Sequence, residues 1–188
     1  MRIGIDIDDT ISLTNEKMIE EAYLYDQNFV KGKGFKNKEA YSFMEMFYWS
    51  VVDVDQFLDY VRKSKMFLEL EVKDGTVDAI NKLYDAGNEI YFITKRNNNF
   101  RTKLMTKKWL KNNGFKYHKL ILGAKNKKEV CESLNIDFFV DDNVHNIETV
   151  SELGIKSVLM ASPYTEDAQD LVRLDTWSEI YNYINEVK

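Results

Sequence analysis

Three aspartates follow the first short apolar stretch of the chain. In RIGIDIDDTI, Asp6, Asp8 and Asp9 place three carboxyl groups within four positions. Isoleucine at every second position from 3 to 7 is the alternation expected of a strand that enters a core. Carboxylates that converge in a partly dry site repel one another, so this spacing makes sense only if a cation lies among them.

Further polar side chains follow later apolar runs. Thr94 ends the run YFIT, and the pair Asp141 and Asp142 ends the run FFVDD. The lysines between these two runs are Lys125, Lys127 and Lys128. If the runs are neighbouring parallel strands, all of these groups meet at one edge of the sheet. Oxygen ligands without cysteine or histidine favour Mg²⁺, which takes few protein carboxylates together with water and substrate phosphate.

The elements that position these groups follow one repeated pattern. From about residue 73 onward, an amphipathic segment, a residue that tolerates the left-handed conformation and a short apolar run occur four times. The residues at the expected helix ends are Gly87, Gly114, Asn135 and Gly154. With residues 2–7 as the first strand, the pattern predicts an α/β fold with a doubly wound, Rossmann-like parallel sheet. Ligands of such sheets bind outside the carboxyl ends of the strands.

The segment at 14–72 interrupts this pattern and contains no convincing alternating strand. Its three candidate helices span residues 15–30, 38–49 and 53–67. We therefore expect a small helical cap at 14–72, inserted into an α/β core made of residues 1–13 and 73–188. The insertion is dense in aromatic residues, Tyr41 among them. Most of these rings are expected to form a small bundle core, and one or two to face a cleft.

Composition bounds the class of protein. The 188 residues are 44% hydrophobic and 13% aromatic, which is enough for a buried core and argues against disorder. A net charge of −5 disfavours a nucleic acid polymer as partner and is compatible with a small anionic ligand. No apolar run reaches the length of a signal peptide or a membrane span, so we expect a cytoplasmic protein with no membrane partner. Cys131, His118 and His145 do not have the spacing of a zinc site, and a lone cysteine forms no internal disulfide.

The segment DIDDT fits the DxDxT signature of the haloacid dehalogenase superfamily of phosphatases. Thr94, the lysine cluster and the pair of aspartates at 141 and 142 follow in the order of that superfamily, so the resemblance spans nearly the whole chain. A helical cap between the first motif and the threonine strand is similar as well. Within the superfamily the chain most resembles the 5′(3′)-deoxyribonucleotidase-like group. The segments that carry this narrower resemblance are EVKDGTVDAINKLYDAGNEIYFIT, KKEVCESLNIDFFVDDN and SPYTED.

The resemblance implies a phosphatase that works through an aspartyl phosphate. Asp6 would be the nucleophile that attacks phosphorus, which divides a slow hydrolysis into two steps. Asp8 would protonate the leaving alkoxide and later take a proton from the attacking water. That role requires neighbours that raise the pKa of the Asp8 carboxyl.

The resemblance also implies how the phosphoryl group is bound. The Thr94 hydroxyl and the backbone amide of Lys95 would bind a phosphoryl oxygen at the start of the next helix. A lysine would neutralise the charge on the nucleophile and the phosphate. Lys127 best matches the family spacing, and Lys125 and Lys128 remain alternatives.

For the metal, the resemblance implies Mg²⁺ held by the side chains of Asp6 and Asp141 and by the backbone carbonyl of Asp8. Asp142 would be either a second ligand or a support outside the ligand sphere. Strand alternation alone does not decide between the two aspartates of the pair, and we favour Asp141.

Other polar residues nearby have simpler interpretations. Asp9 and Asn143 are expected to cap helices or to solvate loops. Lys95, Arg96 and the asparagines that follow are expected to form a helix start and a solvated turn, so that no catalytic side chain comes from them. His145 is expected at a surface position of a helix.

Two other functions compete with hydrolysis. A receiver-like signalling domain also combines an acidic pair, a phosphorylated aspartate, a hydroxyl group and a lysine, but its acidic pair ends the first strand. A phosphate-binding domain without catalysis would share the fold, yet no key position of the motif is substituted here. Halide displacement is disfavoured because that reaction needs no acid, whereas Asp8 supplies one.

The expected substrate is a small phosphorylated metabolite. A nucleoside monophosphate is preferred because an aromatic insertion can stack a base, and sugar phosphates are the alternative. A homodimer is compatible with the sequence.

Overall fold

The computed structural model describes residues 1–40, 42–162, 165 and 170–187. The chain forms two compact units, one of Met1–Leu13 with Glu71–Lys188 and one of Thr14–Leu70. We call them the core unit and the helical unit. Tyr41 and most of the segment SPYTED lie outside the described residues.

The core unit resumes at Glu71, whereas the sequence pattern placed its second segment from residue 73. The reason is a short pairing between the two chain segments that lead out of and back into this unit. The amide of Leu13 donates to the carbonyl of Glu71 at 2.9 Å, and Ser12 pairs with Val72 in an antiparallel bridge.

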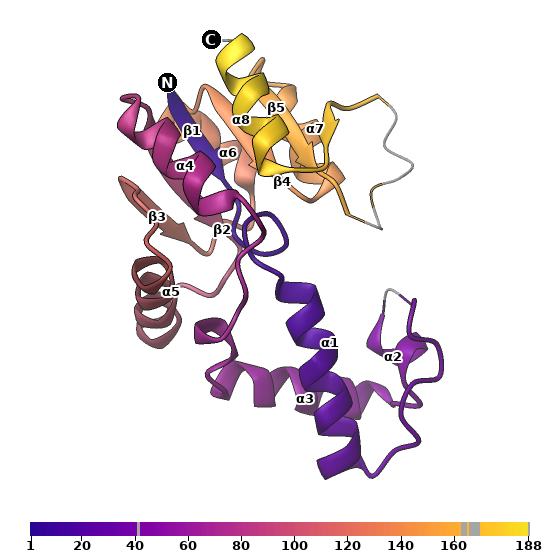
Figure 1. Cartoon of the computed structure of the whole chain (residues 1–188). Helices are drawn as coiled ribbons and strands as arrows, with labels where there is room; N and C mark the ends of the chain where they lie inside the picture. The colour runs from indigo at the N-terminus through magenta and orange to yellow at the C-terminus, as the bar shows by residue number, and fades with distance from the viewer. Residues whose placement is uncertain (41, 163–164, 166–169, 188) are drawn as a thin grey trace. The chain divides into compact units, whose positions relative to one another are not determined.

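A parallel sheet forms the centre of the core unit. Among the described residues its strands are β1 (Arg2–Ile5), β2 (Glu89–Thr94), β3 (Lys119–Leu122), β4 (Phe138–Asp141), β5 (Lys156–Met160) and β6 (Arg173–Leu174). They lie in the order β3-β2-β1-β4-β5-β6, and each neighbouring pair is parallel (Figure 1). The predicted doubly wound α/β fold is confirmed.

The position of β1 in the middle of the sheet explains its sequence. Ile3 and Ile5 are completely buried, because strands and helices surround β1 on all sides. Ile5 pairs with Phe92 of β2 and with Val140 of β4. The three strands therefore end at nearly the same level, and the residues that follow them share one edge of the sheet.

Helices alternate with these strands as the sequence predicts. Those of the core unit are α4 (Thr76–Asp85), α5 (Phe100–Asn112), α6 (Lys127–Leu134), α7 (Val144–Ser151) and α8 (Trp177–Glu186). The four residues expected at helix ends all have positive φ, from 50° at Asn135 to 83° at Gly87. Glycine and asparagine tolerate this conformation, and it lets the chain turn from a helix into the next strand.

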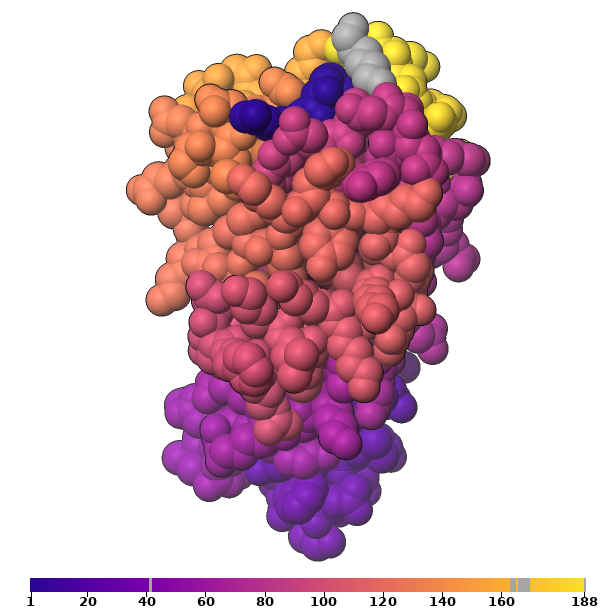
Figure 2. Space-filling model, turned by 90° about the vertical axis from the view of Figure 1, so that its left-hand side faces the viewer, coloured from indigo at the N-terminus to yellow at the C-terminus, as the bar shows by residue number. Residues whose placement is uncertain are grey.

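The helices cover both faces of the sheet. Figure 1 shows α4 and α8 packed together in front of the strands, and α6 and α7 packed together behind them. Under the second pair lies a buried cluster that includes Ile93, Phe139, Ile147 and Leu159. Figure 2 views the side of β3, where the segment from α5 to α6 forms much of the surface of the core unit.

The last elements of the core unit were not expected from the sequence. β6 adds an edge strand, and α8 follows it behind a capping box in which Thr176 and Glu179 exchange hydrogen bonds. Trp177 is buried, and its Nε1 donates to the carbonyl of Thr10 at 2.9 Å. The final helix is thus tied to the loop that follows β1.

The helical unit consists of short helices. These are α1 (Thr14–Tyr25), which continues into the π-helical turn η1 (Asp26–Val30), α2 (Phe43–Met46), α3 (Val51–Lys63) and the 3-10 turn η2 (Met66–Leu68). In the described part of the chain, no helix has the combination of length and apolar character needed to cross a membrane.

The predicted helix at 38–49 was wrong in extent, since among the described residues of this segment only the four of α2 are helical. Phe47 is extended and pairs with Phe35 in an antiparallel bridge. The carbonyl of Met46 accepts hydrogen bonds from the amides of Lys36 and Asn37 at 2.8 and 3.2 Å. The helix ends because its backbone groups pair with the 35–37 segment instead of with the next turn.

An aromatic core holds the helical unit together. Tyr25, Trp49 and Phe57 are buried, and their ring centroids lie 5.3 to 5.8 Å apart. Contacts at these distances add to the free energy that burial of the rings provides. Other rings of the unit remain partly in solvent; Tyr23, Phe29 and Tyr48 are 41 to 61% exposed.

One carboxylate, that of Asp26, is completely buried in this unit. It accepts hydrogen bonds from Trp49 Nε1 at 2.7 Å, from the Gly34 amide at 2.9 Å and from Gln27 Nε2 at 2.9 Å. Gly32 lies so close that a Cβ atom there would come within 2.0 Å of Asp26 Oδ1. Asp26 therefore fixes the chain where α1 ends and the next segment begins.

Candidate active site

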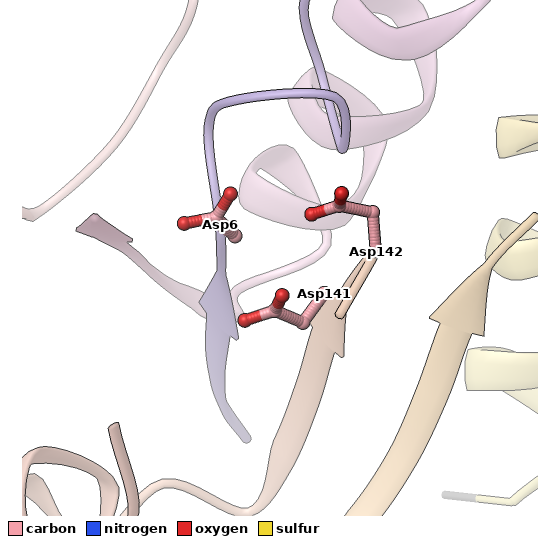
Figure 3. A group of neighbouring side chains, drawn as sticks. All are labelled: Asp6, Asp141 and Asp142. Carbon is pink, nitrogen blue, oxygen red and sulfur yellow. The ribbon is translucent and has the colours of Figure 1, made fainter. Parts of the chain in front are cut away.

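Three carboxylates meet where β1 and β4 end. Asp6 follows β1, and its amide still donates to the carbonyl of Val140 at 2.9 Å, which keeps it in line with the neighbouring strand. Asp141 is the last residue of β4, and Asp142 follows it. One carboxylate oxygen from each aspartate lies within 4.8 Å of the others (Figure 3).

A buried lysine joins two of these carboxylates. Lys127 is the first residue of α6; its Nζ donates to Asp6 Oδ1 and to Asp141 Oδ2, the latter at 2.6 Å. The side chains of these three residues are at most 6% exposed. The geometry thus separates the three candidate lysines, because Lys128 pairs with Glu152 and the Lys125 side chain is exposed.

Burial of this group creates an electrostatic conflict. Burial raises the pKa of Asp6 well above its usual range; Lys127 opposes this effect, and the neighbouring carboxylates reinforce it. For Lys127, burial lowers the pKa, but the charges of Asp6 and Asp141 outweigh burial and raise it. Among the described residues, the ammonium group of Lys127 is therefore shared by a cluster of carboxylates that carries more negative than positive charge.

Asp142 experiences the remaining excess of negative charge. Burial raises its pKa to about 7, with the charges of Asp141 and Asp9 acting in the same direction. Its Oδ1 accepts a hydrogen bond from the Thr10 hydroxyl at 3.3 Å. A carboxyl group that keeps a proton near neutral pH for this reason would exchange that proton for a cation.

The hydrogen bonds distinguish the two members of the acidic pair. Asp141 accepts from Lys127, from the Asn143 amide at 3.0 Å, and from Asn146 Nδ2 at 3.1 and 3.0 Å. A carboxylate offers about four lone-pair positions, so protein donors already occupy those of Asp141. Asp142 has more open positions. The sequence-based preference for Asp141 as the direct metal ligand is therefore not favoured by these contacts.

Thr94 lies at the same edge of the sheet, as the last residue of β2. It is buried, its Oγ1 accepts a hydrogen bond from the Arg96 amide at 3.2 Å, and its hydroxyl approaches Asp8 Oδ2 at 3.4 Å. The strand order brings Thr94 and Asp8 together, because β2 is the neighbour of β1. The side chain of Lys95 is exposed.

Arg96 was expected in a solvated turn, and this placement was wrong, because the residue is buried. Its side chain is only 2% exposed, and its guanidinium forms a fork with the Asp8 carboxylate. Nη2 lies 2.7 Å from Asp8 Oδ1, and Nε lies 2.9 Å from Oδ2. Asp8 thus contacts a cation, which stabilises its charged form. The expected role as an acid had instead led us to predict neighbours that favour its protonated form.

A signal for Arg96 was present in the sequence. Residues two apart in an extended segment point to the same side, so Arg96 follows Thr94 on the side that faces Asp8. A charged residue at that place is ordinarily assigned to solvent, and only the neighbouring strand supplies its partner.

A basic pocket adjoins Lys127. It has a volume of about 360 Å³. Its lining consists of Lys95, Lys125, Asn126, Lys127, Lys128, His145, Asn146 and Thr149. The pocket is positive although the protein carries a net charge of −5, so it is a place where an anion is favoured.

The minor residues behave as expected. Asn143 caps α7, since its side chain accepts a hydrogen bond from the Asn146 amide at 3.1 Å. Asp9 lies in the loop after β1 with a φ of 56°. His145 is an exposed residue of α7.

The donor set fits a hard divalent cation. The described residues offer three carboxylates within reach of one another, in a pocket where only one buried lysine offsets their charge. Mg²⁺ prefers oxygen ligands of this kind and keeps several waters when few carboxylates bind it.

Comparison with solved structures identifies the fold. The chain matches the haloacid dehalogenase-like family hydrolase SP0104 from Streptococcus pneumoniae with a TM-score of 0.71, 14% identity and coverage of 97% of both chains. The core unit therefore has the fold of the haloacid dehalogenase superfamily, as the resemblance implied.

The family follows from the sequence match. The model described as "5' nucleotidase, deoxy (Pyrimidine), cytosolic type C protein" matches residues 1–188, and the chain belongs to this family. Similar proteins are "Putative nucleotidase OB0422" of Oceanobacillus iheyensis, 25% identical over 95% of this chain and 96% of the other, and nucleotidase CA_C3379 of Clostridium acetobutylicum, 27% identical over 71% of each. The protein is a phosphoric monoester hydrolase of the nucleotidase type.

Proposed function

We propose that the protein is a Mg²⁺-dependent 5′-nucleotidase that hydrolyses (deoxy)nucleoside monophosphates through an aspartyl phosphate. The observation that carries this proposal is the buried Asp6 carboxylate, held between Lys127 and the acidic pair at the ends of the central strands. A nucleophile needs a fixed position and a partner that offsets charge, and Lys127 provides both.

In the first step an oxygen of Asp6 attacks the phosphorus of the substrate. The new bond joins this oxygen to phosphorus, and the bond between phosphorus and the ester oxygen breaks. Asp8 gives its proton to the leaving alkoxide, so the nucleoside departs as a neutral alcohol. Lys127 remains beside Asp6 and stabilises the negative charge that gathers on the transferring group.

In the second step water attacks the phosphorus of the aspartyl phosphate. Asp8, now a carboxylate, takes the proton from this water. The bond between Asp6 and phosphorus breaks, and inorganic phosphate and the free carboxylate of Asp6 result. The two steps together consume the substrate and one water molecule, and Asp6, Asp8 and Lys127 return to their starting states.

For the metal we infer Asp6 and Asp142 as side-chain ligands and the backbone carbonyl of Asp8 as a third, with Asp141 in support. The contacts of Asp141 with Lys127, Asn143 and Asn146 suit a supporting residue. When bound, Mg²⁺ would neutralise negative charge on the carboxylates and the phosphoryl oxygens.

The phosphoryl oxygens would be bound by the Thr94 hydroxyl, the Lys95 amide and Lys127. Thr94 is buried at the end of β2 and has a defined hydrogen-bond environment, which suits a binding group. The basic pocket beside Lys127 favours an anionic substrate over a neutral one.

We further propose that the helical unit acts as a cap that selects the substrate. Its partly exposed rings, those of Tyr23, Phe29 and Tyr48, could stack a base, and such stacking is worth about 1 to 3 kcal/mol per base. The printed names of the relatives, which are nucleotidases, support a nucleotide over a sugar phosphate. A cytoplasmic location belongs to this proposal and is supported by the word "cytosolic" in the family description.

The test is hydrolysis by the purified protein with Mg²⁺. Release of phosphate would be measured for a panel of nucleoside 5′- and 3′-monophosphates and a matched panel of sugar phosphates. We expect the highest kcat/KM for a nucleoside monophosphate. Turnover of sugar phosphates without any nucleotide turnover would refute the nucleotidase and leave a phosphatase of another substrate class.

A further inference from the structure

The contact between Arg96 and Asp8 goes beyond the phosphatase motif described above. We propose that Arg96 is a positioning residue for proton transfer, which holds the Asp8 carboxyl in the orientation that the transfer needs. This inference rests on the proposed function of Asp8 as the proton donor.

The geometry of the fork fixes the plane of the Asp8 carboxyl. Nε and Nη2 of Arg96 lie 3.1 and 2.7 Å from Oδ1, and Nε lies 2.9 Å from Oδ2. A planar guanidinium that contacts both oxygens restrains the orientation of the carboxyl as well as its distance. A lysine at the same place would supply charge without this restraint.

Arg96 is itself held from the side opposite to Asp8. Its Nη1 donates to Thr106 Oγ1 of α5 at 3.3 Å, and the guanidinium lies 6.0 Å from the centroid of the buried Trp109 ring. The Arg96 amide donates to Thr94 Oγ1, and its carbonyl accepts from the Gly123 amide at 2.8 Å. The arginine is therefore part of the rigid core, and Asp8, with 30% of its side chain exposed, is the partner open to solvent.

The fixed orientation serves the first step. As the proton moves from Asp8 to the alkoxide, a carboxyl that is already held in plane needs no reorganisation before the transfer. After the leaving group has departed, the same contact holds the Asp8 carboxylate where the attacking water needs a base.

The test uses the leaving group. An alkyl phosphate such as a nucleoside monophosphate needs a proton donor, while an aryl phosphate such as p-nitrophenyl phosphate leaves without one. The measure is kcat/KM, because it includes only the steps up to departure of the leaving group. We expect Arg96→Met to lower kcat/KM by about 10²-fold for the nucleotide, within the range of general acid catalysis, and by less than about fivefold for the aryl phosphate.

Two further variants make the result specific. Arg96→Lys should restore only a small part of the loss for the nucleotide, since an ammonium group can bind one oxygen of the carboxyl but cannot fix its plane. Asp8→Asn should show the same dependence on the leaving group, and Arg96→Met should add little to the loss in an Asp8→Asn background. The matched control is Arg173→Met on β6, an equal loss of charge and length, which should lower kcat/KM for both substrates equally or not at all.

Equal losses for the two substrates in Arg96→Met would overturn the inference and assign Arg96 a structural role only. Additive losses in the double variant would overturn it as well. If Arg96→Met is too unstable to purify, Arg96→Lys decides by the same ratio of the two substrates. A wild-type protein that hydrolyses neither phosphate would instead refute the proposed function, and the inference with it.

Discussion

The core unit and the helical unit both bury carboxyl groups, but they compensate the charge in opposite ways. In the helical unit Asp26 meets three neutral donors, from Trp49, Gly34 and Gln27. In the core unit Asp6 lies beside other carboxylates and shares a single lysine with Asp141.

The contrast separates a structural carboxylate from a chemical one. Burial by itself does not mark a functional site, since Asp26 is completely buried and holds the chain in place. What marks the core site is the gathering of several buried carboxylates: burial raises the pKa values of Asp6 and Asp142, and the charges of the neighbouring carboxylates add to this effect. Buried charge of one sign lowers the stability of the folded protein, and it serves a function only when a substrate or a cation neutralises it.

The largest effect that separates the two units is expected from Asp6→Asn. The amide has nearly the same shape and cannot form an aspartyl phosphate, so kcat should fall by at least about 10⁴-fold. Stability should be retained, because the substitution removes one of several repelling carboxylates. Phosphate release and thermal unfolding of the same preparation would be measured, and substantial residual turnover would remove Asp6 as the nucleophile.

The next effect concerns stability. Lys127→Met leaves Asp6 and Asp141 without their cation and should lower the free energy of unfolding by about 3 to 5 kcal/mol in metal-free buffer. Urea denaturation with and without Mg²⁺ would test this, and Mg²⁺ should recover part of the loss.

The adjacent residue provides a matched control for that variant. Lys128 pairs with Glu152 in a contact open to solvent, so Lys128→Met should change the unfolding free energy by less than about 1 kcal/mol. If both lysine variants lose the same stability, Lys127 does not hold the charge of the site together.

In the helical unit the corresponding test is Asp26→Asn. Either orientation of the amide turns its NH₂ group toward a donor, so at least one hydrogen bond is lost, at a cost of about 1.5 to 3 kcal/mol. Activity should stay within about threefold at temperatures where the unit remains folded. Asp53→Asn, at the exposed capping box of α3, is the control, with an expected cost below about 1 kcal/mol. A loss of kcat in Asp26→Asn without a loss of stability would contradict the structural role.

The most gradual effect is a dependence of stability on pH, because it is spread over several pH units. The pKa of Asp142 is about 7 in the folded protein and near its ordinary value of 3.8 in the unfolded chain. Below pH 3.8 both states are protonated, and between about pH 4 and 7 only the folded state keeps the proton. The free energy of unfolding of the metal-free protein should therefore fall as pH rises through this window, by up to about 1.4 kcal/mol per unit, and then level off.

Denaturation in EDTA at a series of pH values would measure this slope. Asp142→Asn should reduce it and leave the part that comes from the raised pKa of Asp6, and Mg²⁺ should reduce it by taking the place of the proton. An identical slope in the wild type and in Asp142→Asn would show that another group titrates.

Much of the core unit could be predicted from its sequence because the signals are local. The four helix ends at Gly87, Gly114, Asn135 and Gly154 all have positive φ, and the alternating isoleucines of the first strand are buried. Acidic residues directly after buried strands predicted the edge of the sheet where the three carboxylates meet. β6 was missed because a two-residue strand carries almost no periodic signal. The sequence did carry a signal for α8, the capping-box pair Thr176 and Glu179, and it was overlooked.

The helical unit was harder to predict for a physical reason. The apolar pattern at 38–49 suits a helix, yet Met46 and Phe47 pair with residues 35–37. Tertiary pairing thus overrides local propensity, which differs between helix and other states by only a few tenths of a kcal/mol per residue.

By itself the sequence determined the parallel α/β core and the set of residues at its strand ends, because strand and helix periods are properties of neighbouring residues. The tertiary structure decided which groups meet. It placed Lys127 against Asp6 and Asp141, left Asp142 more open than Asp141, and joined Arg96 to Asp8. These choices depend on side-chain directions from strands far apart in the sequence, and charges act over distances that only the fold sets.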